Sequence, residues 1–188
     1  MALRTILKYP DKRLRVPGKP VASVEPALGA LLDDMAETMY AAPGVGLAAT
    51  QIGLALRVFV LDLQQNDEAE RATGLQVFIN PEILERRGEV VWEEGCLSFP
   101  GIHEDIHRDG WIRARALDRS GQPFEVEAEG LYAVAIQHEI DHLDGVLLVD
   151  RVSLLKRRFI HRKMLKWHQA AQHRESHEEP EPPGRPAL

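Results

Sequence analysis

Two histidines four residues apart, with a glutamate beside the first, stand in the segment His138-Glu139-Ile140-Asp141-His142. On a helix, residues four apart lie on one face, so His138 and His142 can each donate a nitrogen to a single metal ion. Glu139 lies one position around the helix, where it is better placed to hold a water at the ion than to bind the ion itself. The mostly apolar residues between Gly130 and His138 indicate a buried helix, on which charged and polar groups need partners. The motif therefore predicts metal-dependent hydrolysis.

A catalytic site of this kind usually has three protein ligands and one open position. The zincin proteases supply the third ligand downstream, but Leu148 stands where the metzincin pattern requires a histidine, and no glutamate follows before Glu175. The only cysteine, Cys96, lies upstream, after a strand-like run and next to Gly95. A lone cysteine is more often a small buried hydrophobe than a ligand. Its thiolate is nevertheless the candidate for the third ligand.

A third notable segment runs from Gly44 to Gln51 and consists mainly of small residues. Gly44 and Gly46 allow a backbone to approach a ligand closely, and Gln51 offers an amide donor of the kind that stabilises an oxyanion. The segment lacks the Lys-Ser/Thr ending of the P-loop and the third glycine of the dinucleotide fingerprint. Taken alone, it is equally compatible with a tight turn into packed structure.

In this order, the three segments resemble the motifs of the peptide deformylase family. They read GVGLAATQ at residues 44–51, EGCLS at 94–98 and QHEIDHL at 137–143. Residues 7–11 also resemble the opening of that family, and the likeness spans about residues 7–152. The ordered triple, with a cysteine in its middle member, is far more specific than one histidine motif.

The resemblance implies a bacterial-type, iron-dependent metallohydrolase that removes the formyl group from the formyl-methionine of nascent polypeptides and releases formate. It implies one divalent metal ion, natively Fe(II), with Zn, Ni or Co as replacements. The implied metal ligands are Cys96, His138 and His142. Glu139 is then the general acid/base, and Gln51 and the backbone N–H of Leu97 form the oxyanion hole.

The family also builds an apolar pocket for methionine around the metal helix. The matching positions are Trp92, Leu131, Val134 and His138, with Val45 at the rim. Leu131 and Val134 fit an ordinary core equally well.

The peptide behind the methionine is expected to pair as an added strand with the backbone near Val45, Gly46 and Gly95, and Glu94 is grouped with these substrate-binding residues. Two positions depart from the expected pattern. His103 stands where many bacterial members carry arginine near the peptide exit, and Trp92 is bulkier than the expected aliphatic residue.

The length of 188 residues and the 44% share of hydrophobic residues predict one domain with a substantial core. The expected division is a catalytic domain over 1–150, a basic amphipathic helix over 151–174 and a disordered tail rich in Glu and Pro over 175–188. A single cysteine excludes an internal disulfide, and its ligand role favours the reducing cytoplasm. Since no apolar run approaches the ~18 residues of a membrane span, no membrane partner is expected.

Hydrophobic patterning predicts more strands than helices before the metal helix. The expected elements are a helix over 25–42 and strands over 56–61, 76–79, 85–92, 111–117 and 124–128. The sequence Asp118-Arg119-Ser120-Gly121 favours a hairpin turn between the last two strands. We therefore expect an α+β fold, with antiparallel β-sheets packed around a central metal-binding helix and an additional C-terminal helix.

The segment from Arg151 to Trp167 is basic and contains no Asp or Glu. Its apolar residues at helical spacing are Leu154, Leu155, Phe159, Ile160 and Leu165. One interpretation is a docked helix with a solvated basic face. The other, which the resemblance suggests, is contact with the ribosome. The basic residues for it are Arg151, Lys156, Arg157, Arg158, Arg162 and Lys163. The net charge of −6 argues against binding of free nucleic acid.

Two other classes of function remain open at this point. A zincin-type peptidase shares the histidine motif but does not explain Cys96 or Gln51. A closed, non-catalytic zinc module needs a fourth protein ligand. The remaining histidines all lie outside the motifs; they are His103, His107, His161, His168, His173 and His177.

Overall fold

The structure is a computed structural model, and it describes residues 2–63 and 74–175. Its helices are α1 (Pro26–Ala41), α2 (Gly130–Leu143) and α3 (Leu154–Glu175), with short 3-10 helices η1 (Lys12–Arg15), η2 (Ala49–Ile52) and η4 (Leu148–Asp150). Its strands are β1 (Gly46–Ala48), β2 (Val58–Leu61), β3 (Gln76–Arg87), β4 (Val90–Gly95), β5 (His103–Arg108), β6 (Trp111–Leu117) and β7 (Pro123–Glu129). The predicted α+β class with a C-terminal helix is confirmed.

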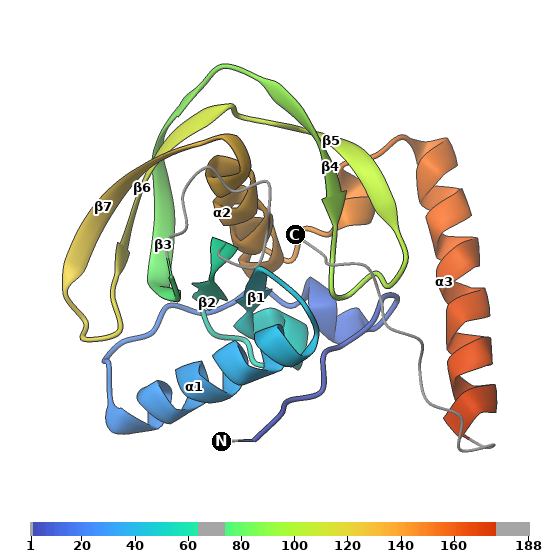
Figure 1. The fold of residues 1–188 in the computed structure, drawn as a ribbon, viewed down its shortest axis with the longest axis horizontal. Coiled ribbons are helices and arrows are strands. Elements are labelled where there is room, and N and C mark those ends of the chain that lie inside the picture. Colours follow the sequence, from blue (N-terminus) through green and yellow to red (C-terminus); the bar gives the residue numbers. More distant parts are fainter. Residues whose placement is uncertain (1, 64–73, 176–188) are drawn as a thin grey trace.

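Two antiparallel sheets form the framework. The larger has the strand order β1-β2-β3-β6-β7, and the smaller consists of β4 and β5. In Figure 1, α2 lies at the centre of the fold, α1 closes one side and α3 runs along the outer edge. β7 leads directly into α2 at Gly130, whose φ of +56° turns the chain. The direct connection from β7 therefore places α2 between the two sheets.

Helix α2 is a core helix, because almost all of its residues are buried. A helix that is covered on every side must be apolar apart from functional groups. Its apolar side chains join those of the larger sheet in one cluster, in which Phe59 of β2 stacks on Phe78 of β3 with ring centroids 4.5 Å apart. Both histidines of the metal motif and Glu139 are thus buried within the core.

The predicted strand over 85–92 is wrong, because the chain turns a corner inside it. Gly88 has a φ of +66°, and the Gly110 N–H donates to its carbonyl at 3.5 Å. Before this corner β3 pairs with β6, and after it β4 pairs with β5. The strand predicted over 76–79 is accordingly too short, since β3 continues to Arg87. The strand predicted over 56–61 begins later, at Val58.

Two strands, β1 and β5, have no counterpart among the predicted strands. β5 reads HEDIHR and contains one apolar residue, Ile106, which is fully buried. A strand with so few apolar residues has no readable alternation, and its existence depends on pairing with β4. β1 lies in the segment over 44–51, for which a tight turn was one of the open interpretations, and it pairs with β2 over three residues.

Helix α3 docks through only one residue of the predicted apolar stripe, Ile160. Its buried residues are Ile160 and Met164, and Trp167 packs beside them. They meet a cluster that includes Tyr9, which stacks on Phe99 at 4.9 Å. The other residues of the predicted apolar stripe are exposed; they are Leu154, Leu155, Phe159 and Leu165. Among the described residues, no helix is long and apolar enough to span a membrane.

Candidate metal centre

The structure brings Cys96 and the two motif histidines together at one buried point. Cys96 follows β4 directly, while His138 and His142 lie on the same face of α2. Their candidate ligand atoms lie within 4.8 Å of one another, and Cys96 Sγ is 3.2 Å from His142 Nε2. All three residues are buried. A thiolate and two imidazoles are donors that suit zinc and iron alike.

Unpartnered polar atoms at this point support a bound ion. Within the part of the chain that the structure describes, His138 Nε2 and Glu139 Oε2 are buried at this point without a hydrogen-bond partner. Buried polar atoms normally have partners, because leaving one unsatisfied costs about 1–3 kcal/mol. Burial also lowers the pKa of His142, which favours the neutral imidazole that metals require. The residues present therefore fit one divalent metal ion.

Glu94 and Arg108 fix His138 through its Nδ1, the ring nitrogen that would not bind the metal. Glu94 Oε2 lies 2.8 Å from His138 Nδ1, and the Arg108 guanidinium donates to both Glu94 oxygens at 2.6 and 2.9 Å. Burial would raise the pKa of Glu94, but the hydrogen bonds and charges of Arg108 and His138 outweigh it and lower that pKa to about 2. Since the carboxylate is ionised, it accepts from a protonated Nδ1, and Nε2 is the ring nitrogen that would bind a metal.

Glu94, which the sequence analysis grouped with the substrate-binding residues, contacts Arg108 and His138 in this structure. Its side chain is fully buried, and both carboxylate oxygens are engaged by Arg108 and His138. Sequence reasoning missed Arg108 altogether. It lies in β5, a strand whose polar composition gave no sign of a buried end, and only the pairing of β4 with β5 brings it to Glu94.

Glu139 lies in a tight space beside β1. A Cβ atom added to Gly46 would lie only 2.4 Å from Glu139 Oε1, so only glycine permits this approach. Burial raises the pKa of Glu139 to about 7, against the opposing charge of His138. A carboxyl group whose pKa lies near neutrality is well suited to proton transfer.

Gln51 lies on η2 and directs its amide toward the same point. Its Oε1 accepts from the backbone N–H of Ala48 at 2.8 Å, which fixes the orientation of the amide. Its Nε2 then lies 3.7 Å from Cys96 Sγ and 3.3 Å from Ser98 Oγ. Leu97, the other predicted oxyanion-hole residue, directly follows Cys96, and its carbonyl accepts from Lys8 Nζ at 2.7 Å.

The predicted methionine-pocket residues belong to a single apolar cluster. Val45, Leu131 and Val134 are buried members of it, and Trp92 packs against it while remaining partly exposed. Gly95 pairs with His103 across β4 and β5. Among the described residues, β4 has no strand partner other than β5.

Comparison with known proteins identifies close relatives over most of the chain. Residues 3–158 match the sequence model of the family described as polypeptide deformylase. The chain is 57% identical to the peptide deformylase of Alkalilimnicola ehrlichii over 166 residues, which cover 88% of this chain and 91% of the relative. It is 52% identical to that of Azotobacter vinelandii over 169 residues, or 89% and 98% of the two chains.

Solved structures give the same picture. The crystal structure of a peptide deformylase from Legionella pneumophila matches with a TM-score of 0.84 and 46% identity, covering 91% of this chain and 98% of that one. The structure of peptide deformylase from Ehrlichia chaffeensis in complex with actinonin matches with a TM-score of 0.83 and 38% identity, covering 88% and 98%.

Proposed function

The chain belongs to the polypeptide deformylase family, and from this premise we propose that it removes the N-formyl group from the formyl-methionine of nascent polypeptides, releasing formate. The observation that carries this proposal is the buried cluster of Cys96, His138 and His142, together with the unpartnered, buried Oε2 of Glu139 on the same helix. No fourth ligand joins the cluster among the described residues, which favours an open catalytic site over a closed structural one.

We propose Fe(II) as the native ion, with Zn, Ni or Co able to replace it. Cys96, His138 and His142 would hold it. When bound, a divalent ion supplies water with a pKa lowered from about 15.7 towards 7, so that the nucleophile is available at neutral pH.

Glu139 carries the proton in this mechanism. It accepts the proton from the attacking water as the new carbon–oxygen bond forms at the formyl carbon. It then passes the proton to the amine nitrogen as the carbon–nitrogen bond breaks. The products are formate and a free N-terminus.

Gln51 and the backbone N–H of Leu97 would stabilise the developing charge on the formyl oxygen. The Gln51 amide is already oriented by Ala48, so little reorganisation is needed when the substrate binds. Each well-aimed donor of this kind contributes roughly 3 kcal/mol to the transition state.

Substrate recognition would combine an apolar pocket with main-chain pairing. Val45, Trp92, Leu131 and Val134 would surround the methionine side chain. The following residues would add as a strand to β4 beside Gly95, with Gly46 on the opposite side, a mode that reads the main chain and tolerates varied side chains.

We also propose that α3 contacts the ribosome, which would place the enzyme in the cytoplasm where nascent chains emerge. Several of the basic residues named for this role have internal partners. Arg151 pairs with Asp141, Lys156 with Glu104, Arg157 with Asp150, and Lys163 donates to the carbonyl of Gly101.

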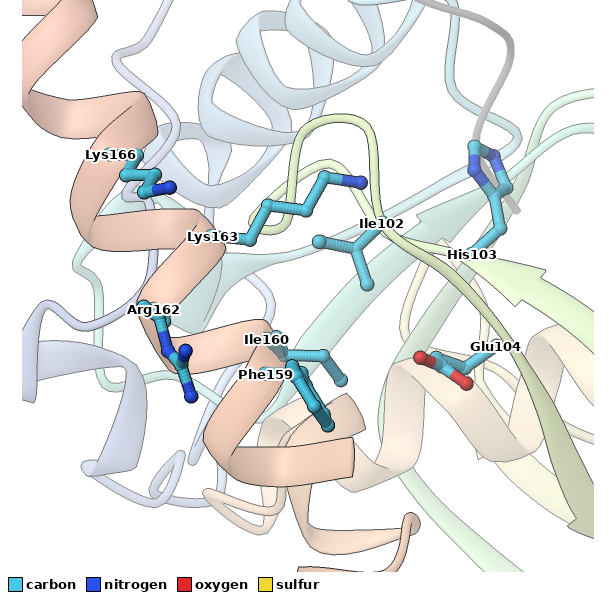
Figure 2. Close-up of a pocket in the computed structure, with 8 residues that line it drawn as sticks. All are labelled: Ile102, His103, Glu104, Phe159, Ile160, Arg162, Lys163 and Lys166. Atoms are coloured by element: carbon cyan, nitrogen blue, oxygen red, sulfur yellow. The ribbon is translucent and has the colours of Figure 1, made fainter. Parts of the chain in front are cut away.

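The contact would therefore depend most on Arg158 and Arg162, which are exposed on α3. Figure 2 shows Arg162 and Lys166 along α3 at a groove that Phe159 and Ile102 also line. A double variant, Arg158→Glu with Arg162→Glu, should lose salt-sensitive co-sedimentation with ribosomes. Co-sedimentation equal to that of the wild type would reject this contact.

The activity itself is tested with a formyl-methionyl tripeptide and anaerobically iron-loaded protein. Formate should be released while the peptide bonds stay intact, as mass spectrometry would show, and the matching acetyl-methionyl peptide should react far more slowly. Actinonin, which is bound in the relative from Ehrlichia chaffeensis, should inhibit the reaction. Cleavage of the peptide without formate release would instead support the zincin-type peptidase.

A further inference from the structure

A continuous series of ion pairs leads from the segment before α3 to the metal ligand His138. Arg151, between η4 and α3, donates from Nε to Asp141 Oδ2 at 2.9 Å and from Nη2 to Asp141 Oδ1. Arg108 Nη1 donates to the same Asp141 Oδ2 at 2.5 Å, while its Nε donates to Glu94 at 2.6 Å. Glu94 in turn accepts from His138 Nδ1 at 2.8 Å.

With His138 neutral, as a metal ligand must be, the charges in this series balance only when Arg151 is included. Glu94 and Asp141 carry two negative charges, and Arg108 and Arg151 carry two positive ones. The side chains of Arg108, Glu94 and Asp141 are 4%, 0% and 13% exposed, whereas that of Arg151 is 41% exposed. Without Arg151, two buried carboxylates would share the single guanidinium of Arg108, and buried charges tolerate such an imbalance poorly.

We propose that Arg151 is a positioning residue for the metal centre: by pairing with Asp141 it leaves Arg108 held on Glu94, which fixes the orientation and tautomer of His138. Deprived of Arg151, Asp141 would draw Arg108 away from Glu94. The Glu94 carboxylate would then hold the His138 ring less rigidly, and the metal would dissociate faster.

The position of Arg151 in the chain gives this inference a second consequence. Arg151 lies on the connection that α3 anchors, since Ile160 and Met164 of α3 are buried against the cluster around Phe99. Arg157 of α3 also donates to the carbonyl of Val149 at 2.8 Å. The docking of the C-terminal helix thus holds Arg151 in place, and through it the metal ligand.

The chain offers a matched control for this proposal. Arg57 pairs with Asp144 at 2.6 Å at the C-terminal end of the same helix α2, but among the described residues no further ion pair joins this pair to a metal ligand. Arg57→Met and Arg151→Met therefore each remove an arginine that pairs with an aspartate at the C-terminal end of α2, and only Arg151→Met should disturb His138.

The experiment measures metal retention in full-length, cobalt-loaded protein without substrate. Transfer of cobalt to excess EDTA should be about three- to tenfold faster in Arg151→Met, below the 10–100-fold typical of a residue that contacts a ligand directly. The visible absorption bands of the bound cobalt should shift in the same variant. Arg151→Lys should restore part of the retention, and Arg57→Met should match the wild type.

Two results would overturn the proposal. The first is wild-type cobalt retention and an unchanged spectrum in Arg151→Met. The second is equal acceleration in Arg151→Met and Arg57→Met, which would indicate a general loosening of α2. The inference rests on the metal site of the proposed function but not on its substrate. A chain that holds cobalt yet releases no formate would refute the activity alone.

Discussion

Replacing Glu139 with glutamine should abolish activity and yet stabilise the metal-free protein at alkaline pH. Glu139 is 1% exposed, and burial raises its pKa from 4.5 to about 7. The folded state therefore binds the proton more tightly than the unfolded state does. The stability this gives is fully present below pH 4.5 and is lost as the pH rises through 7. At about 1.4 kcal/mol per pH unit, ionised Glu139 costs the folded state about 3 kcal/mol.

Urea unfolding of chelator-treated wild type and Glu139→Gln, at pH 5 and at pH 8, measures this cost. From pH 5 to pH 8, the free energy of unfolding of the variant should rise by about 2 to 3 kcal/mol relative to that of the wild type. The change is smaller than the full cost of ionising Glu139, because part of that cost is already present at pH 5. Comparing the two pH values cancels any constant difference between a buried amide and a buried carboxylic acid.

Adding a divalent metal should reduce the difference in unfolding free energy between the two proteins at pH 8, because a nearby cation favours the ionised carboxylate of Glu139. A difference in stability between the two proteins that does not change with pH would refute the reasoning. It would mean that the Glu139 carboxylate is reached by water or has a hydrogen-bond partner in the metal-free fold.

Three further predictions concern the neighbours of Glu139 and His138. Gly46→Ala should displace the Glu139 carboxylate, because the new Cβ would lie 2.4 Å from Oε1. A displacement of about 1 Å at a reacting group can lower kcat by about 100-fold. Steady-state kinetics, with the metal content measured in parallel, checks this. Arg108→Met should cost about 3–5 kcal/mol in urea unfolding at pH 7, because the buried carboxylate of Glu94 would lose its guanidinium partner; a cost below 1 kcal/mol would contradict a stabilising role for this ion pair. The pKa of Glu94 is lowered to about 2, so its ionised carboxylate contributes about 3 kcal/mol to the free energy of unfolding above pH 4.5. This contribution is lost as the pH falls towards 2. Glu94→Gln should therefore remove this acid-dependent loss of stability, as urea unfolding at low pH would show.

The features that could be predicted from the sequence are those that depend on short-range spacing along the chain. The i, i+4 spacing of His138 and His142 places both on one helical face whatever surrounds them. The ordered motifs then indicated Cys96 as their companion, and the structure brings its sulfur to 3.2 Å from His142. The roles of Gln51 and Leu97 in catalysis remain predictions.

The parts that were missed depend on contacts between distant segments. Arg108 reaches Glu94 only because β5 pairs with β4, and β5 has too few apolar residues to be recognised alone. The corner at Gly88 interrupts a run whose composition reads as one strand. Similarly, the docking face of α3 is set by the cluster of Tyr9 and Phe99 that receives it, so the apolar spacing of α3 indicated Ile160 but missed Met164 and Trp167.

The most direct test of the account is formate release measured against bound metal. Anaerobically iron-loaded wild type should release formate from a formyl-methionyl tripeptide in proportion to its iron content, up to one ion per chain. Glu139→Gln loaded to the same content should bind the iron and release almost none. Iron-loaded wild type that produces no formate, or a Glu139→Gln variant as active as the wild type, would contradict the assignment of this site to deformylation.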